Sequence, residues 1–154
     1  MAGTSAGNDC FVCEKHRQGA AATGGVAFGD DLVFVGHLLP PDLEDVYLGW
    51  LIVEPKRHVA GWGQLRDDEA AALGKTINKV AAALRDSEGA EHVYTLVLGD
   101  AVPHLHVHVI PRYPSTPQEY WGLKVRDWPE APRGGEAEIG AVIERIRNTL
   151  QAES

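Results

Sequence analysis

The most informative segment of the sequence is Pro103-His104-Leu105-His106-Val107-His108-Val109-Ile110-Pro111-Arg112, in which histidine and apolar residues alternate strictly through the middle. Successive side chains of a β-strand point to opposite faces of a sheet. We therefore expect a strand over Leu105–Ile110, with the apolar residues in the core. The three histidines would then share the other face as a row of imidazoles.

Two chemistries suit such a row. Two histidines at positions i and i+2 can share one zinc ion, but the whole row spans roughly 13 Å, too far for one ion to bind all three rings. Alternatively, one imidazole attacks a phosphorus atom while its neighbours orient it and bind phosphate oxygens. An imidazole with a pKa near 6.5 is largely unprotonated at neutral pH, as a nucleophile must be.

Outward from this stretch, the chain has the pattern of an α+β domain. Apolar residues recur at spacings of three and four over Arg66–Ser87 and Glu136–Gln151, which predicts two main helices. Short apolar or β-branched runs predict further strands at Val26–Phe28, Asp31–Val35, Val46–Glu54 and Val93–Leu98. The expected fold is a mainly antiparallel sheet of about five strands with two helices.

The expected domain organisation is simple. Residues 1–9 are small and polar and predict a flexible N-terminus, whereas residues 10–152 predict a single domain. Within that domain, residues 111–135 are rich in proline and contain two of the four tryptophans. We expect this segment to be an irregular flap, either an aromatic staple against its own domain or a lid over a ligand.

Composition excludes several classes of function. With 14 Lys and Arg against 22 Asp and Glu, the formal net charge is −8, which disfavours nucleic-acid binding. No apolar run approaches the roughly 20 residues of a membrane helix. No basic and then apolar segment marks a secretory signal, so we expect a cytoplasmic protein with reduced Cys10 and Cys13. By itself this C-x-x-C pair suits metal ligands, a redox pair or two free thiols.

The sequence His104-Leu-His106-Val-His108-Val-Ile110 resembles the signature of the histidine triad (HIT) family of nucleotide hydrolases and transferases. The flanks agree: Cys10-Phe-Val-Cys13, Val53-Glu-Pro-Lys-Arg-His58-Val, and Val102-Pro before the first triad histidine. The resemblance runs from about Cys10 to Arg112. It implies a HIT-like fold and a homodimer.

The resemblance also implies an activity. His106 corresponds to the nucleophile that forms a nucleotidyl-histidine intermediate, and His108 to the residue that binds the phosphate oxygens. The expected substrate is a nucleoside phosphate compound, either a dinucleoside polyphosphate, as for a diadenosine polyphosphate hydrolase, or a nucleoside phosphoramidate. By resemblance to zinc-containing members, Cys10, Cys13, His58 and His104 would form a structural zinc site with no open position. A catalytic metal on the triad itself remains a rival interpretation.

The sequence departs from the family at three places. Many members carry Gly-His where this chain has Gly49-Trp50, and Asp100 stands where a neutral amide would meet a phosphate. A carboxylate there repels phosphate unless it turns away or pairs with a cation. The third departure is the flap, in which Arg112 is a candidate contact for phosphate oxygens. These departures leave open an alternative, a non-catalytic nucleotide-binding regulator with a HIT fold.

Overall fold

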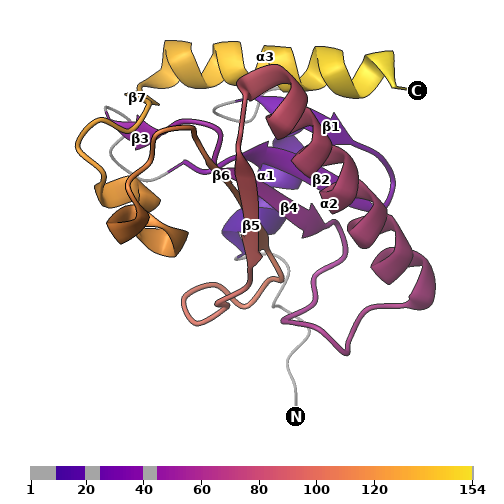
Figure 1. Cartoon of the computed structure of the whole chain (residues 1–154). Helices are drawn as coiled ribbons and strands as arrows, with labels where there is room; N and C mark the ends of the chain where they lie inside the picture. The colour runs from indigo at the N-terminus through magenta and orange to yellow at the C-terminus, as the bar shows by residue number, and fades with distance from the viewer. Residues whose placement is uncertain (1–9, 20–24, 40–44, 154) are drawn as a thin grey trace.

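The computed structural model describes residues 10–19, 25–39 and 45–153 (Figure 1). Its main sheet has five antiparallel strands in the order β1-β2-β4-β6-β5. These strands are β1 (Val26–Gly29), β2 (Val33–His37), β4 (Leu51–Pro55), β5 (His92–Leu96) and β6 (Val107–Arg112). A small second sheet pairs β3 (Val46–Tyr47) with β7 (Arg133–Gly134). The expected α+β fold with a five-stranded antiparallel sheet is confirmed.

The α-helices of the described residues are α1 (Phe11–Gln18), α2 (Asp67–Glu88) and α3 (Glu136–Ala152), and they pack around the sheet. The two predicted main helices are confirmed as α2 and α3, and α2 ends where Gly89 adopts a positive φ of 74°. The short helix α1 was not predicted, because eight residues give too little periodicity to recognise. None of the helices in the described residues is long and apolar enough to cross a bilayer.

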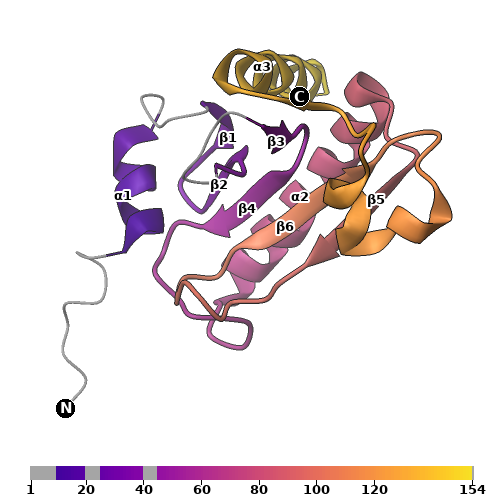
Figure 2. The same cartoon turned by 90° about the vertical axis from the view of Figure 1, so that its left-hand side faces the viewer.

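One face of the main sheet carries the larger core. Side chains of alternate strand residues, such as Val53 and Val107, pack there with Leu73 and Leu84 of α2 and Ile143 of α3. Figure 2 shows α2 behind the sheet and α3 across one end of it. This packing leaves the opposite face of β4 and β6 for other partners.

The opposite face of the sheet is covered by α1 and by the predicted flap. Trp50 and Ile52 of β4 and its entry turn pack with Tyr113, Val125 and Trp128 of the flap in a second apolar cluster. The flap was predicted to be irregular, but part of it is regular. It contains two 3₁₀ helices, η2 (Gln118–Tyr120) and η3 (Gly122–Asp127), and the strand β7. Its packing corresponds to the aromatic staple.

Four strand predictions need correction. The segments Asp31–Val35 and Val93–Leu98 are observed as β2 (Val33–His37) and β5 (His92–Leu96), and two further segments differ more. The segment Val46–Glu54 is two strands in different sheets, separated by a turn at Gly49, whose φ is 87°. The histidine strand begins at Val107 instead of Leu105 and continues through Pro111. Proline is tolerated there because β4 pairs with β6 only at residues 107–109, so Pro111 has a neighbouring strand on one side only. The predicted flexible residues 1–9 lie outside the described residues.

Candidate active site and metal cluster

The three histidines of the triad stretch serve two separate places, and only His108 is within β6. His104 is fully buried and faces the two cysteines at the start of α1. His106 and His108 line a cavity of about 150 Å³ between the sheet and α1. The predicted continuous row is therefore divided, because His104 and His106 precede β6. The amide of Leu105, between them, donates to the carbonyl of Val59, 2.7 Å away, outside the main sheet.

Hydrogen bonds define which nitrogen of His106 carries the proton. Its Nδ1 lies 2.7 Å from the carbonyl oxygen of His104. A carbonyl can only accept, so Nδ1 carries the hydrogen, and in the neutral ring Nε2 holds the free lone pair. The ring centroids of His106 and His108 are 5.1 Å apart with an angle of 72° between the planes. The two rings are therefore in edge-to-face contact in the cavity.

His108 has the complementary arrangement. The indole Nε1–H of Trp50 donates to its Nδ1 over 3.0 Å. An indole nitrogen is a donor only, so the neutral His108 ring carries its hydrogen on Nε2. Burial, followed by the neighbouring His106, lowers the pKa of His108, which favours this neutral form. The two rings therefore combine a lone pair and an N–H donor.

A buried charged group forms part of the same cavity. Glu54 is 1% exposed and accepts hydrogen bonds from Lys15 Nζ at 2.7 Å and His16 Nε2 at 2.8 Å. Burial alone would raise the pKa of Glu54, but these two partners hold it below its usual value. Our sequence reasoning missed this group. The available signal was an acidic residue inside the buried apolar run of β4.

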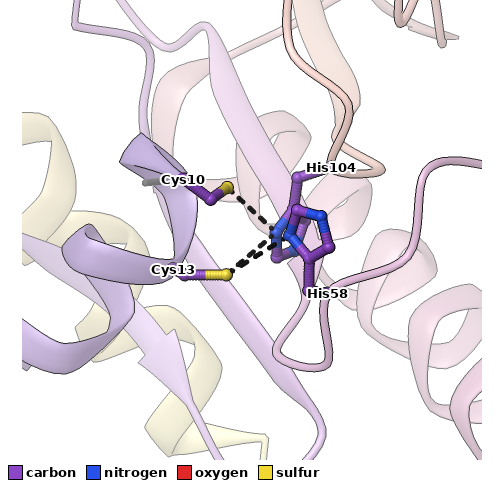
Figure 3. A group of neighbouring side chains, drawn as sticks. All are labelled: Cys10, Cys13, His58 and His104. Carbon is purple, nitrogen blue, oxygen red and sulfur yellow. Dashed lines mark hydrogen bonds between the residues drawn. The ribbon is translucent and has the colours of Figure 1, made fainter. Parts of the chain in front are cut away.

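The second place is a cluster of two cysteines and two histidines, Cys10, Cys13, His58 and His104 (Figure 3). Their ligand atoms all lie within 4.8 Å of one another. Cys10 Sγ is 3.6 Å from His104 Nδ1, and Cys13 Sγ is 3.5 Å from the Nδ1 atoms of both His58 and His104. Sulfur and nitrogen ligands about 2.3 and 2.0–2.1 Å from a tetrahedral zinc lie roughly 3.5 Å apart, so these spacings fit that ion.

The protein around the cluster orients its ligands. His104 Nε2 donates to the carbonyl of Pro55 over 2.8 Å. In the neutral ring Nδ1 therefore carries the free lone pair, and it faces the thiols. Both cysteines are free thiols in the structure. Burial and the adjacent Cys10 raise the pKa of the Cys13 thiol, which disfavours its thiolate form. A bound cation would stabilise the thiolates and offset this effect. The cluster can therefore hold a metal ion.

Two other predicted residues lie elsewhere. Asp100 is exposed in the loop after β5 and does not line the cavity. Arg112 lies at the end of β6, where its guanidinium stacks 3.9 Å from the ring of Trp121 and bonds to Tyr94 Oη at 3.0 Å. The structure brings His106, His108 and the four-residue cluster to the same end of the sheet, but it does not bring Arg112 to the cavity.

An antiparallel sheet with two cavity-lining histidines beside a Cys₂His₂ cluster defines a class of protein rather than a single activity. The profile of the HIT domain matches residues 30–115, more than half of the chain. The chain belongs to the HIT family.

Known proteins agree with this assignment. An adenosine 5'-monophosphoramidase of Schizosaccharomyces pombe is 31% identical over 115 residues, 71% of this chain and 79% of the relative. A zinc-bound histidine triad family protein from Mycobacterium smegmatis has the same fold, with a TM-score of 0.69, 17% identity and 96% of both chains covered. A hypothetical histidine triad nucleotide-binding protein from Sulfolobus tokodaii matches with a TM-score of 0.68, 21% identity and 93% of both chains covered.

Proposed function

We propose that this chain is a nucleotide hydrolase or nucleotidyltransferase that acts through a covalent intermediate on His106. The Nε2 lone pair of His106 attacks the α-phosphorus of a nucleoside phosphate compound. A nitrogen–phosphorus bond forms as the bond to the leaving group breaks. Water or another acceptor then attacks the same phosphorus, releases the nucleotide and restores the ring. Dividing one displacement into two easier steps is the physical advantage of the nucleophile.

The observation that carries this proposal is the complementary pair of rings in the cavity. His106 presents a lone pair, and His108 presents an Nε2–H that can donate to the phosphate oxygens as charge develops on them. A metal site would need lone pairs from both rings, so this pairing favours phosphorus chemistry. His108 is therefore the proposed substrate-binding and catalytic partner of His106.

The proposed substrates are a nucleoside phosphoramidate and a dinucleoside polyphosphate such as a diadenosine polyphosphate. The S. pombe relative is named for phosphoramidase activity, which makes the phosphoramidate the first compound to test. Asp100 lies two residues before Val102, which lines the cavity, so the proposed role for Asp100 is contact with a cationic or metal-bound part of the substrate. Arg112 is outside the proposed contacts because Trp121 and Tyr94 already engage it.

We also propose that the Cys₂His₂ cluster binds a structural zinc ion. All four ligands come from the protein, so no position is left open for substrate, and the ion would join the start of α1 to the loops before β6 and after β4. The zinc-bound M. smegmatis neighbour supports this choice of metal.

A homodimer, as the family resemblance implies, is the proposed assembly. β5 has one neighbouring strand within the described part of the main sheet, which leaves its other edge able to pair. Sedimentation-velocity ultracentrifugation tests this, and a species at the monomer mass across micromolar concentrations would contradict it.

The proposed function is tested by intact-protein mass spectrometry. Wild type is incubated briefly with adenosine 5'-phosphoramidate or diadenosine tetraphosphate and compared with His106→Ala. We expect an added adenylyl mass in wild type alone. Nucleotide binding without an adduct and without released AMP would instead support the non-catalytic regulator.

A matched kinetic prediction concerns the same residue. His106→Ala should lower kcat by a factor on the order of 10⁴, because loss of a nucleophile removes the covalent route. The dissociation constant for AMP should change by less than about threefold, since the other cavity residues remain. Isothermal titration calorimetry and AMP-release assays measure the two effects, and equal turnover in the variant would eliminate the covalent mechanism.

A further inference from the structure

Trp50 occupies the position where many HIT proteins carry a histidine, and it has no role in the reaction proposed above. Its side chain is 5% exposed and lies just before β4, beside β6. Its ring meets that of His108 edge to face, with centroids 5.8 Å apart and an interplanar angle of 82°. Its N–H donates to His108 Nδ1 over 3.0 Å. Trp50 is thus a direct neighbour of a cavity-lining histidine.

The chemistry of indole makes this contact one-directional. An indole nitrogen can donate a hydrogen bond but cannot accept one, whereas the ring nitrogens of a histidine can exchange roles with its tautomer. Only the His108 tautomer with a lone pair on Nδ1 can accept from Trp50. The hydrogen of a neutral His108 must therefore reside on Nε2.

Packing prevents the indole from turning away. Trp50 lies in the second apolar cluster, where its ring contacts Tyr47 edge to face with centroids 6.4 Å apart. Tyr47 is itself held by a 2.6 Å hydrogen bond from its hydroxyl to the carbonyl of Pro111. A buried indole in a close-packed cluster keeps one orientation, so its N–H remains directed at His108.

We propose that Trp50 is a positioning residue that holds His108 as a permanent Nε2–H donor to the phosphate oxygens. This inference rests on the proposed function, because it assigns the donor a role in the same phosphoryl transfer. The indole of Trp50 does not change its protonation state, so Trp50 orients His108 without taking part in proton transfer.

The first test reads the tautomer directly in the free protein. In long-range ¹H–¹⁵N spectra of histidine-labelled wild type at neutral pH, we expect the Nε2–H tautomer of His108 with a hydrogen-bonded Nδ1 acceptor. In Trp50→Phe the Nδ1 signal should shift toward that of a non-bonded nitrogen. Wild-type His108 with its hydrogen on Nδ1 would overturn the proposal.

The second test is kinetic and uses a matched control. Trp50→Phe should lower kcat for adenosine 5'-phosphoramidate about tenfold or more, with KM changed less than about threefold, because the donor acts on charge that develops in the transition state. Trp128→Phe removes an indole from the same apolar cluster but leaves the hydrogen bond and ring contact of Trp50 with His108 in place, so it should keep wild-type kcat. Equal kcat values for the two variants would overturn the positioning role.

A third variant separates loss of the N–H from loss of packing. Benzothienylalanine at position 50 replaces the indole N–H with sulfur and keeps the shape of the ring, so it should fold even if Trp50→Phe does not. It should reproduce the loss of kcat and the Nδ1 shift, and wild-type behaviour would refute the inference. If wild type releases no AMP, the proposed function fails, whereas the histidine spectra still decide whether Trp50 holds His108.

Discussion

In each histidine of the triad stretch, a hydrogen bond at one ring nitrogen determines whether the second nitrogen carries a lone pair or a hydrogen. His104 donates from Nε2 to the carbonyl of Pro55 and so turns Nδ1 toward the cysteines. His106 donates from Nδ1 to the carbonyl of His104, which leaves Nε2 free. The alternation in the sequence predicted that these rings share a side of the sheet. It could not predict the tautomers of His104 and His108, because their partners Pro55 and Trp50 come from a distant segment, at the end of β4 and just before it.

In His37, protein hydrogen bonds fix the tautomer and also occupy both ring nitrogens. It is 3% exposed, its Nδ1 donates to Leu38 O at 2.8 Å, and its Nε2 accepts from the amide of Gly49 at 2.9 Å. Burial is the main cause that lowers its pKa below 6.5. The ring lines the cavity but has no free nitrogen for a ligand.

A pH dependence of stability follows from His37. A folded-state pKa below the unfolded value means that its contribution is complete above about pH 6.5 and is lost as pH falls through the folded pKa. Urea unfolding of wild type should therefore require less denaturant at pH 5 than at pH 7. His37→Gln, which cannot titrate, should be less stable at pH 7 and show a weaker pH dependence. His92→Gln, at an exposed site, is the control, and an unchanged slope in His37→Gln would contradict this assignment.

At the scale of elements, the turn at Gly49 decides how β3 and β4 separate. A Cβ at Gly49 would lie 2.4 Å from Tyr113 Oη, and the positive φ already favours glycine. The hydrophobic pattern of Val46–Glu54 reads as one strand because it contains no break in polarity. Only the close approach of the flap shows that the chain must turn there.

The start of α2 is organised by a single buried carboxylate. Glu69 is 2% exposed; its oxygens accept from Arg57 at 2.7 and 2.8 Å and from the Arg66 backbone amide at 2.8 Å. The Arg57 side chain, and then the amide of Arg66, lower the pKa of Glu69 from 4.5 to about 2. The loop after β4 is thereby joined to the helix.

Glu69→Gln should destabilise the fold by about 1–3 kcal/mol, because it removes charge-assisted hydrogen bonds at a buried helix start. The wild-type carboxylate contributes fully above about pH 4.5 and loses its contribution as pH falls toward about 2. Chemical denaturation at pH 7 and pH 3 measures both effects. Asp86→Asn removes an exposed partner of Arg85 and should change stability by less than about 0.5 kcal/mol, and a similar loss in both variants would contradict the prediction.

At the scale of the whole molecule, α1 is joined to the sheet by two polar groups: the Cys₂His₂ cluster and the pairing of Glu54 with Lys15 and His16. Two of the four cluster residues come from the start of α1. A metal ion there would couple the helix that covers the cavity to the histidine strand. Metal binding would then contribute to folding.

Removing this metal should lower thermal stability. Purified protein should contain one zinc per chain by inductively coupled plasma mass spectrometry, and a strong chelator or Cys13→Ser should lower Tm by about 5 °C or more. His106→Ala should retain the metal. Metal content that survives Cys13→Ser but falls in His106→Ala would instead support a metal on the triad.

Residues 10–152 are proposed to unfold as one domain. The apolar clusters on the two faces share the strands β4 and β6. Leu51 and Val107 belong to one cluster, and Ile52 and Ile110 belong to the other. Loss of either cluster would expose the same strands. Tryptophan fluorescence and far-ultraviolet circular dichroism should therefore give coincident urea transitions, and separate midpoints would contradict a single domain.

Periodicity and residue chemistry determined much of this protein. The spacing of apolar residues predicted α2 and α3, the histidine alternation predicted a shared side, and the motif resemblance named the four cluster residues. Each of these depends on residues close together in sequence or on a recognised motif. Local patterns of this kind are largely independent of what the rest of the chain contributes.

How those parts come together depends on contacts between segments that are distant in the sequence. The tertiary structure divided the histidines between a Cys₂His₂ cluster and a cavity, placed Trp50 on His108, and engaged Arg112 away from the cavity. The physical reason is that a hydrogen bond or a close contact depends on atoms from distant segments meeting within about 3–4 Å. Sequence spacing specifies which side a residue faces, and the packing of other elements specifies what it meets there.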